Sequence, residues 1–169
     1  MKTYVIEDRK HCNYFKDLKW VVDAISDDVS RMAAITCLHV DPDNVFVATD
    51  GGRLHLAKIE TPEKIEAGNY KVIKGKGNFT LVEDTDVTYP DYYKIIPELT
   101  TGVELKIPPK KNIGLFSGAY SNLIRLMPKN CINLKFFEGL QDETWIVQVG
   151  DGTMALLFNN SHKTAVIMP

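Results

Sequence analysis

Apolar and polar residues alternate with a period of two along much of the chain. The clearest alternation covers residues 45–60, where it is interrupted by Asp50-Gly51-Gly52. Such residues supply the positive φ that a tight hairpin turn needs, so this stretch predicts strand, turn and strand. In two other stretches the apolar residues recur at helical spacing. The full pattern predicts helices over 15–26 and 115–127, the hairpin over 45–60, and strands over 3–6, 33–40, 70–74, 78–83, 103–107, 132–138, 144–149, 154–158 and 164–168.

Turn residues and prolines separate these elements. Asn13 is the expected N-cap of the first helix, and Asp27-Asp28 are expected to end it. Residues 75–77 (Gly-Lys-Gly) predict a hairpin turn rather than a phosphate-binding loop, because no helix is expected after them. Asp151-Gly152 predict a second hairpin turn. Prolines at both ends of residues 89–97 predict an extended, semi-rigid segment.

The order of the elements predicts the fold class. A helix followed by strands occurs twice, which indicates a two-fold pseudo-repeat with antiparallel connections. We therefore expect an α+β fold in which two helices pack on antiparallel sheets. A chain of 169 residues can bury one sizeable core, so a single domain over 1–169 is expected, with 1–14 as a candidate N-terminal extension.

Composition narrows the function classes. The chain is 44% hydrophobic and 25% charged with a net charge of −2, so any contact with DNA must come from a local basic patch. The apolar runs are too short to span a bilayer, and the N-terminal residues lack the apolar core of a signal peptide. Three scattered cysteines are typical of reduced thiols. These features predict a cytoplasmic protein that does not enter a membrane.

No set of residues with catalytic spacing is present, which predicts that the protein is not an enzyme. His39 and His55 occupy strand positions, where packed or surface imidazoles are the common case. His11 and Cys12 are adjacent but lack a second pair of ligands, so neither a metal nor a cofactor is predicted. The simplest interpretation of the 45–60 hairpin is that Asp50 caps the turn and pairs with Arg53 on the surface.

Three short segments nevertheless resemble one family, the bacterial DNA polymerase sliding clamp or beta clamp, in the family's own order. Residues 48–57 (ATDGGRLHLA) resemble its Ala-Thr-Asp-Gly-X-Arg-Leu-Ala signature. Residues 89–97 (YPDYYKIIP) resemble its Phe-Pro-Asp-Tyr-X-X-Val-X-Pro segment, and 165–169 (AVIMP) its final Val-Val-Met-Pro run. The resemblance implies a DNA-clamp-like unit. A clamp protomer contains three such units and two protomers close a ring around DNA, whereas this chain has room for about one.

In the clamp, these three motifs line a hydrophobic pocket that receives a short linear motif of polymerases and other replication proteins. Two departures from the family are Gly52, where His is common, and the end of the sequence at Pro169. The alternative is that the matching residues only form the fold, as a turn, a proline-framed linker and a strand. The residues that the resemblance places in the pocket are Thr49, Gly51, Gly52, Arg53, Leu54, Pro90, Ile95, Val166, Met168 and Pro169.

The resemblance also implies helices that face duplex DNA without reading its sequence. The candidate residues are Lys16, Lys19, Arg125 and Lys129. The first helix carries aspartates as well, so a merely solvated face remains open. Our main hypothesis is a sliding-clamp-like processivity or docking factor, as a homo-oligomeric ring of single-unit protomers or as a peptide binder without a ring. The alternatives are a clamp-fold structural or interaction protein without DNA binding, and a small enzyme on this fold.

Overall fold

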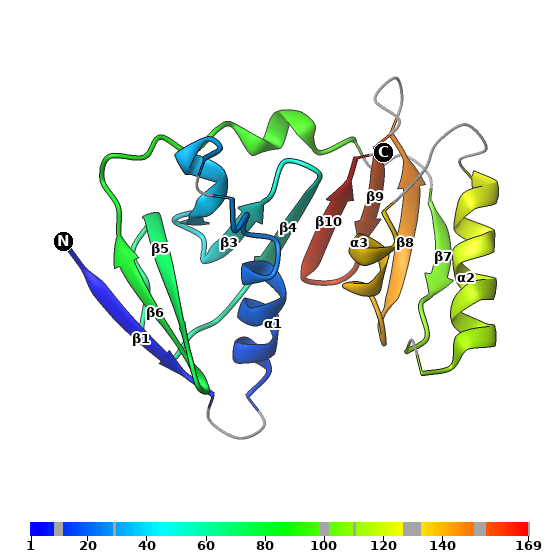
Figure 1. Cartoon of the computed structure of the whole chain (residues 1–169), viewed down its shortest axis with the longest axis horizontal. Coiled ribbons are helices and arrows are strands. Elements are labelled where there is room, and N and C mark those ends of the chain that lie inside the picture. Colours follow the sequence, from blue (N-terminus) through cyan, green and yellow to red (C-terminus); the bar gives the residue numbers. More distant parts are fainter. Residues whose placement is uncertain are drawn as a thin grey trace. The chain divides into compact units, whose positions relative to one another are not determined.

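A computed structural model describes residues 1–8, 12–28, 30–98, 102–109, 111–126, 133–150 and 155–168. The chain divides into two compact units, Met1–Asp91 and Tyr92–Pro169, coloured blue to green and green to red in Figure 1. Each unit contains one helix-covered antiparallel arrangement of strands.

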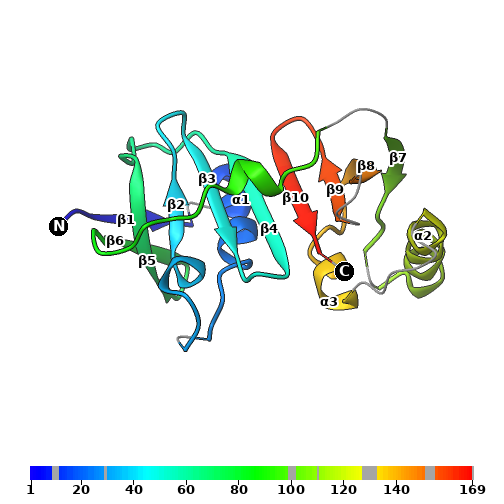
Figure 2. The same cartoon turned by 90° about the horizontal axis from the view of Figure 1, so that it is seen from above.

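Unit 1 is an antiparallel sheet with one long helix packed on it. Its strands are β1 (Thr3–Glu7), β2 (Leu38–Val40), β3 (Val45–Thr49), β4 (Arg53–Lys58), β5 (Gly68–Gly75) and β6 (Asn78–Glu83), in the order β1-β6-β5-β2-β3-β4. Helix α1 (Asn13–Val22) packs against β3 and β4 (Figure 2). It buries Leu18, Val21 and Val22 completely, at the three- and four-residue spacing of one helix face. The core of this unit therefore lies between α1 and the sheet.

Unit 2 is also an antiparallel sheet with helices, and several aromatic side chains pack against one another in it. Its elements are a 3-10 turn η2 (Tyr92–Ile95), β7 (Val103–Lys106), α2 (Ile113–Leu126), α3 (Leu134–Glu138), β8 (Thr144–Val149), β9 (Leu156–Asn159) and β10 (Lys163–Ile167), with strand order β10-β9-β8-β7. The fully buried Phe137 lies 5.1 Å from the ring of Phe116 and 5.4 Å from that of Tyr120. Trp145 meets Phe158 edge-on and donates its indole N–H to the Leu140 carbonyl at 2.9 Å. These contacts join α3 to α2, and they join β8 to β9 and to the turn that follows α3.

The predicted α+β class and pseudo-repeat are confirmed. Unit 1 runs β1-α1-β2-β3-β4-β5-β6 and unit 2 runs β7-α2-α3-β8-β9-β10. In each unit the three strands that follow the helices, β2-β3-β4 and β8-β9-β10, pair consecutively and antiparallel. The two units also differ in the order of their strands. β7 pairs directly with β8, whereas the β5–β6 hairpin separates β1 from β2 in the sheet.

One predicted strand is wrong and another is longer than the strand observed, β2 (Leu38–Val40). The stretch 132–138 was expected to be a strand, but Leu134–Glu138 form α3. Asn133 caps this helix by accepting from the Lys135 N–H at 3.0 Å, and the capping competes successfully with strand pairing. The stretch 33–40 was also expected to be one strand. Its first part is instead a 3-10 turn η1 (Ala33–Thr36), in which the Thr36 hydroxyl donates to the Ala33 carbonyl.

The first helix is shorter than predicted: it begins at Asn13, two residues before the predicted start, and it ends before the predicted end. Cys12 rather than Asn13 occupies the N-cap position, and the helix ends at Val22 instead of Ser26. The Ser26 N–H donates to the carbonyl of Ile35 in η1 at 2.9 Å. It therefore does not bond to a carbonyl four residues earlier, as it would if the helix continued. The segment 89–97 is extended only at its start, since η2 follows. Proline restricts just the residue before it, which leaves Tyr92–Ile95 free to turn.

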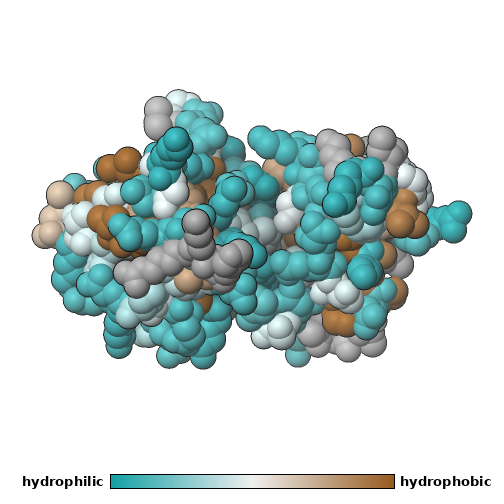
Figure 3. All heavy atoms as spheres, turned by 90° about the horizontal axis from the view of Figure 1, so that it is seen from below, coloured by the Kyte–Doolittle hydropathy of each residue, from teal (hydrophilic) through white to brown (hydrophobic). Residues whose placement is uncertain are grey.

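Several predictions concern residues outside the described ranges, namely the Asp151-Gly152 turn, Lys129 and Pro169. Among the described residues, no helix is long and apolar enough to cross a bilayer. On the face drawn in Figure 3, hydrophobic residues form separate patches among hydrophilic ones.

Candidate functional site

The turn between β3 and β4 is the most strongly specified polar feature of unit 1. Thr49 and Leu54 form the last strand pair, and the Asp50 N–H donates to the Arg53 carbonyl at 3.3 Å. Gly51, one of the two central residues, has a φ of +86°, a value that favours glycine. The Asp50 carboxylate accepts from the N–H groups of Gly52 at 2.9 Å and Arg53 at 3.0 Å. The prediction that Asp50 caps this turn is confirmed.

The Thr49 hydroxyl is also used to hold the turn. It donates to the Arg53 carbonyl at 2.6 Å and accepts from the Gly51 N–H at 3.1 Å. Thr49 is buried, with 8% of its surface exposed. Its described hydrogen bonds therefore stabilise the tip itself. The role of Thr49 in orienting a partner stays a prediction.

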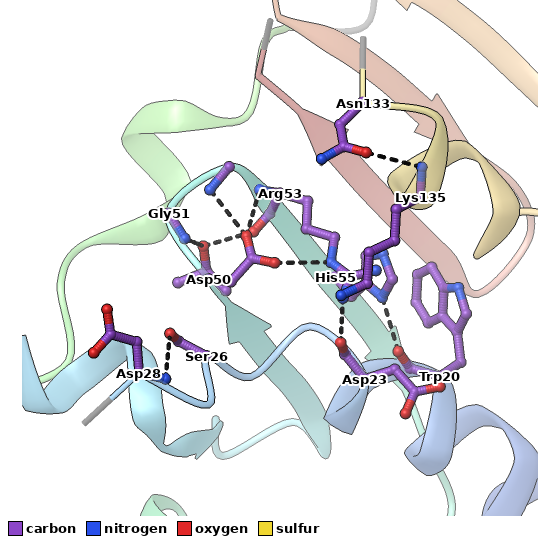
Figure 4. A network of polar contacts seen from close by, with 12 residues as sticks. Trp20, Asp23, Ser26, Asp28, Asp50, Gly51, Arg53, His55, Asn133 and Lys135 are labelled. Carbon is purple, nitrogen blue, oxygen red and sulfur yellow. Dashed lines mark hydrogen bonds and ion pairs between the residues drawn. The ribbon is translucent and has the colours of Figure 1, made fainter. Parts of the chain in front are cut away.

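Arg53 pairs with Asp50 as predicted, but the pair is not on the surface. Arg53 is only 8% exposed, and its Nε donates to the Asp50 carboxylate at 3.1 Å. Its Nη2 donates to the carbonyl of Asp23, directly after α1 (Figure 4). The correction has a physical cause, since a guanidinium can be buried when several donors find acceptors. Arg53 ties the hairpin to the end of α1.

His55 provides a second tie between the hairpin and α1. It is fully buried, with Nδ1 2.8 Å from the Trp20 carbonyl oxygen, and its ring stacks on the Trp20 ring at 4.1 Å (Figure 4). The contacts of Arg53 and His55 thus hold the hairpin in a fixed position against α1. Rigid placement is what a binding surface needs if it is to lose little entropy on binding.

Arg31 belongs to the tip, although the sequence analysis missed it. Its Nη1 donates to the Asp50 carbonyl at 2.8 Å, and a side chain at Gly51 would start 3.0 Å from its Nη2. Unlike Arg53, Arg31 is exposed. No local signal marks Arg31, because it lies outside the three motifs and precedes the stretch mistaken for a strand. It is the exposed cation at this tip.

We expect Gly51→Ala to lower the free energy of unfolding by about 1 kcal/mol, because alanine there is strained at positive φ. The added carbon lies 3.0 Å from the Nη2 of Arg31, but this guanidinium is the exposed end of a flexible side chain and can move aside. Urea denaturation of the full chain measures this loss. The matched control is Gly77→Ala in the β5–β6 turn, where φ is +81° but no heavy atom lies within 4 Å of the added carbon. The control is expected to lose about 1 kcal/mol through φ alone. We expect similar losses in the two variants, and a clearly larger loss in Gly51→Ala would contradict an Arg31 side chain that is able to move aside.

Of the remaining residues predicted to line the pocket, some are buried and others are exposed. In unit 1, Leu54 is buried at 1% exposed and Pro90 is exposed. In unit 2, Val166 is buried at 1%, whereas Ile95 and Met168 are 46% and 38% exposed. Buried apolar side chains belong to the core, so only the exposed ones are accessible to a partner without rearrangement. Membership of all of them in one pocket stays a prediction.

The predicted DNA-facing residues are exposed where the structure describes them. Lys16 and Lys19 lie three residues apart on α1, which places them on one helix face. Arg125 is exposed near the end of α2. Asp23 is exposed directly after α1, so that end of the helix is not uniformly basic. Their role toward DNA stays a prediction.

Among the described residues, no group of three or more His, Cys, Asp or Glu could hold a metal. Each unit also has a hollow that the sequence does not predict. Unit 2 has a groove of about 690 Å³ between the end of β7 and α2, bordered by Leu105, Pro108, Leu115 and Gly118. Unit 1 has a smaller hollow of about 260 Å³ beside β1, bordered by Tyr4 and Tyr14.

Comparison with known proteins gives structural similarity only. No family model and no curated protein matches the sequence. The structure is similar to the C. crescentus beta sliding clamp (TM-score 0.65, 14% identity, 100% of this chain and 65% of that one). It is also similar to DNA polymerase III subunit beta from Borrelia burgdorferi in complex with a natural product (TM-score 0.62, 14% identity, 100% of this chain and 64% of that one). A third similar structure is the Helicobacter pylori beta clamp bound to a DNA ligase peptide (TM-score 0.54, 17% identity, 99% of this chain and 65% of that one).

In each comparison the matched region is less than two thirds of the clamp's length, at 64–65%. Identities of 14–17% leave the fold as the shared property. The fold of this chain is that of the bacterial sliding clamps.

Proposed function

We propose that this chain is a sliding-clamp-like docking protein, and that it binds a short linear motif of a replication partner at the tip of the β3–β4 hairpin. The observation that carries the proposal is the rigid construction of the tip. Thr49, Asp50 and Arg53 hold the turn from within, so the exposed Gly51 and Arg31 are presented in one fixed geometry. The similarity to a clamp bound to a DNA ligase peptide supports this assignment.

The chemistry of the tip indicates how a partner is held. Arg31 offers an exposed guanidinium, which suits a carboxylate or a main-chain carbonyl of an extended peptide. Gly51 lets the peptide approach the backbone closely because it has no side chain. In unit 2, the exposed Ile95 and Met168 remain the predicted apolar contacts, and methionine adapts its shape to different ligands.

Fluorescence anisotropy with a labelled DNA ligase peptide tests the proposal. We expect saturable binding by the full chain, and a loss of about tenfold for Arg31→Ala, equivalent to about 1.4 kcal/mol. Arg125→Ala is the matched control, because it removes an exposed arginine from α2 in unit 2 and is expected to leave the affinity unchanged. Equal affinities of the wild type and Arg31→Ala would contradict docking at this tip.

We propose further that copies of the chain assemble through strand edges into a ring that surrounds duplex DNA. Among the described residues, β1 pairs only with β6 and β7 only with β8, so each leaves one edge for another strand. Light scattering on a size-exclusion column at several concentrations measures the mass. A closed multiple supports the ring, and salt-dependent duplex binding supports a role for Lys16 and Lys19. A monomer without DNA binding would overturn the ring and favour the interaction protein without DNA binding.

A further inference from the structure

The groove of unit 2 lies beside the outer edge of β7. In the described ranges, β7 is the outermost strand of its sheet and pairs only with β8. Directly after β7, the Ile107 N–H donates to the Glu143 carbonyl at 3.1 Å, and the Ile107 carbonyl accepts from the Asp142 N–H at 2.8 Å. Successive residues of a strand direct their backbone groups to opposite sides, so those of Glu104 and Lys106 point away from β8. Each of these two residues therefore presents an N–H donor and a carbonyl acceptor at the free edge.

Helix α2 forms the other wall of the groove, and two glycines keep it open (Figure 2). Gly114 and Gly118 lie four residues apart on one helix face, and a Cβ added at either meets no described heavy atom within 4 Å. Leu115 lines the same groove and is 68% exposed. Leu105 lies opposite the buried Trp145 in the sheet, so its side chain is on the helix-covered face. The groove of about 690 Å³ thus has apolar walls and room for added side chains.

The polar residues that border the groove carry no net charge. Lys106 and Asp142 supply one ammonium and one carboxylate group, and Asn112 and Asn122 supply uncharged amides. A side-chain amide has the same donor and acceptor groups as a peptide bond, so it can bond to a peptide backbone. This border suits an uncharged segment whose backbone is accessible.

We propose that the groove binds an extended, uncharged segment of a partner protein, which adds a strand to the free edge of β7 and places alternate apolar side chains between Leu105 and Leu115. In this mode of recognition, main-chain hydrogen bonds to an exposed strand supply affinity, and pockets for alternate side chains supply specificity. The groove is a second site. The inference therefore goes beyond the docking proposed at the hairpin tip and does not depend on it.

A strand of a second copy suits this groove less well than a flexible segment. Among the described strands, β1 is the other one with a free edge. Its Ile6 is 7% exposed in the core of unit 1, and Tyr4 packs against that core, so neither is available to the groove. The opposite face of β1 carries Thr3, Val5 and Glu7, two of which are polar. A segment outside any folded sheet has both rows of side chains available.

NMR titration of the ¹⁵N-labelled full chain tests the proposal. The probe is a blocked peptide of alternating leucine and threonine, about six residues long like a typical strand, with glycine and serine added at both ends for solubility. We expect the largest shift changes at the amides of Glu104 and Lys106 and along 114–122.

Two further probes carry N-methyl groups, one on the leucine amides and the other on the threonine amides. Only one of these sets faces β7 in a paired strand, so one probe should lose about tenfold or more in affinity and the other should bind nearly as well as the parent. Equal affinities of the two methylated probes would overturn strand addition.

Gly118→Leu fills the groove from α2 and is expected to weaken binding of the parent probe by about tenfold, because the added side chain takes the space of the peptide. Its urea midpoint should not fall, since glycine is a poor residue inside a helix. Ser117→Leu is the matched control, because it adds the same side chain at an exposed position of α2 that does not line the groove, and the affinity should be unchanged. Equal affinities of the wild type and Gly118→Leu would overturn the proposal. Shift changes at the same amides that grow with protein concentration, without peptide, would also overturn it by showing that a second copy is the occupant.

Discussion

Replacing Arg53 with methionine is expected to lower the free energy of unfolding of the chain by about 2 kcal/mol, because it removes the buried guanidinium from a partly buried ion pair and leaves two acceptors without this donor. The Asp50 carboxylate loses the Nε donor at 3.1 Å, and the Asp23 carbonyl loses Nη2. Methionine fills much of the space, so the loss reports mainly on the polar contacts. Urea denaturation at pH 7 measures the change.

Asp50→Asn separates the charge from the turn geometry. Asparagine can still accept the N–H groups of Gly52 and Arg53 through its side-chain oxygen, so the expected loss is smaller than for Arg53→Met. A contrary outcome would be an Arg53→Met protein of undiminished stability that binds the DNA ligase peptide weakly. Arg53 would then contact the partner directly, as the resemblance to the clamps implies, and its buried contacts would carry little energy.

Leu54→Ala is expected to cost about 3 kcal/mol, because Leu54 is 1% exposed and its truncation leaves a cavity. Met168→Ala is the matched control among the predicted apolar pocket residues. Met168 is 38% exposed, so its truncation should change the free energy of unfolding by less than about 0.5 kcal/mol. Urea denaturation of both variants gives the comparison. If both variants lose the same free energy of unfolding, the result would contradict the burial of Leu54 and the exposure of Met168.

The hairpin at the centre of the candidate site was predictable from local sequence. Asp50 and Gly51 specify the turn through short-range hydrogen bonds and the positive φ of Gly51, which depend on few other residues. The burial of Arg53 was not predictable, because the acceptor that receives its Nη2 comes from Asp23, thirty residues away. Arg31 was missed for the same reason, since its contact with Asp50 spans nineteen residues.

The fold class followed from the order of helices and strands, whereas two element types did not. In α3, Phe137 is buried beside Phe116, a partner twenty-one residues earlier that alternation alone does not reveal. In η1, a side-chain hydrogen bond from Thr36 favours a turn over a strand. The insertion of the β5–β6 hairpin between β1 and β2 is a matter of long-range pairing, which local pattern does not determine.

Amide chemical-shift mapping tests the central claim most directly. The ¹⁵N-labelled full chain is titrated with the DNA ligase peptide, and shift changes are assigned along the sequence. Docking at the hairpin tip predicts that the largest changes fall on residues 49–53 and on Arg31. Changes confined to the groove along α2, around Leu115 and Gly118, or no changes at saturating peptide, would contradict it.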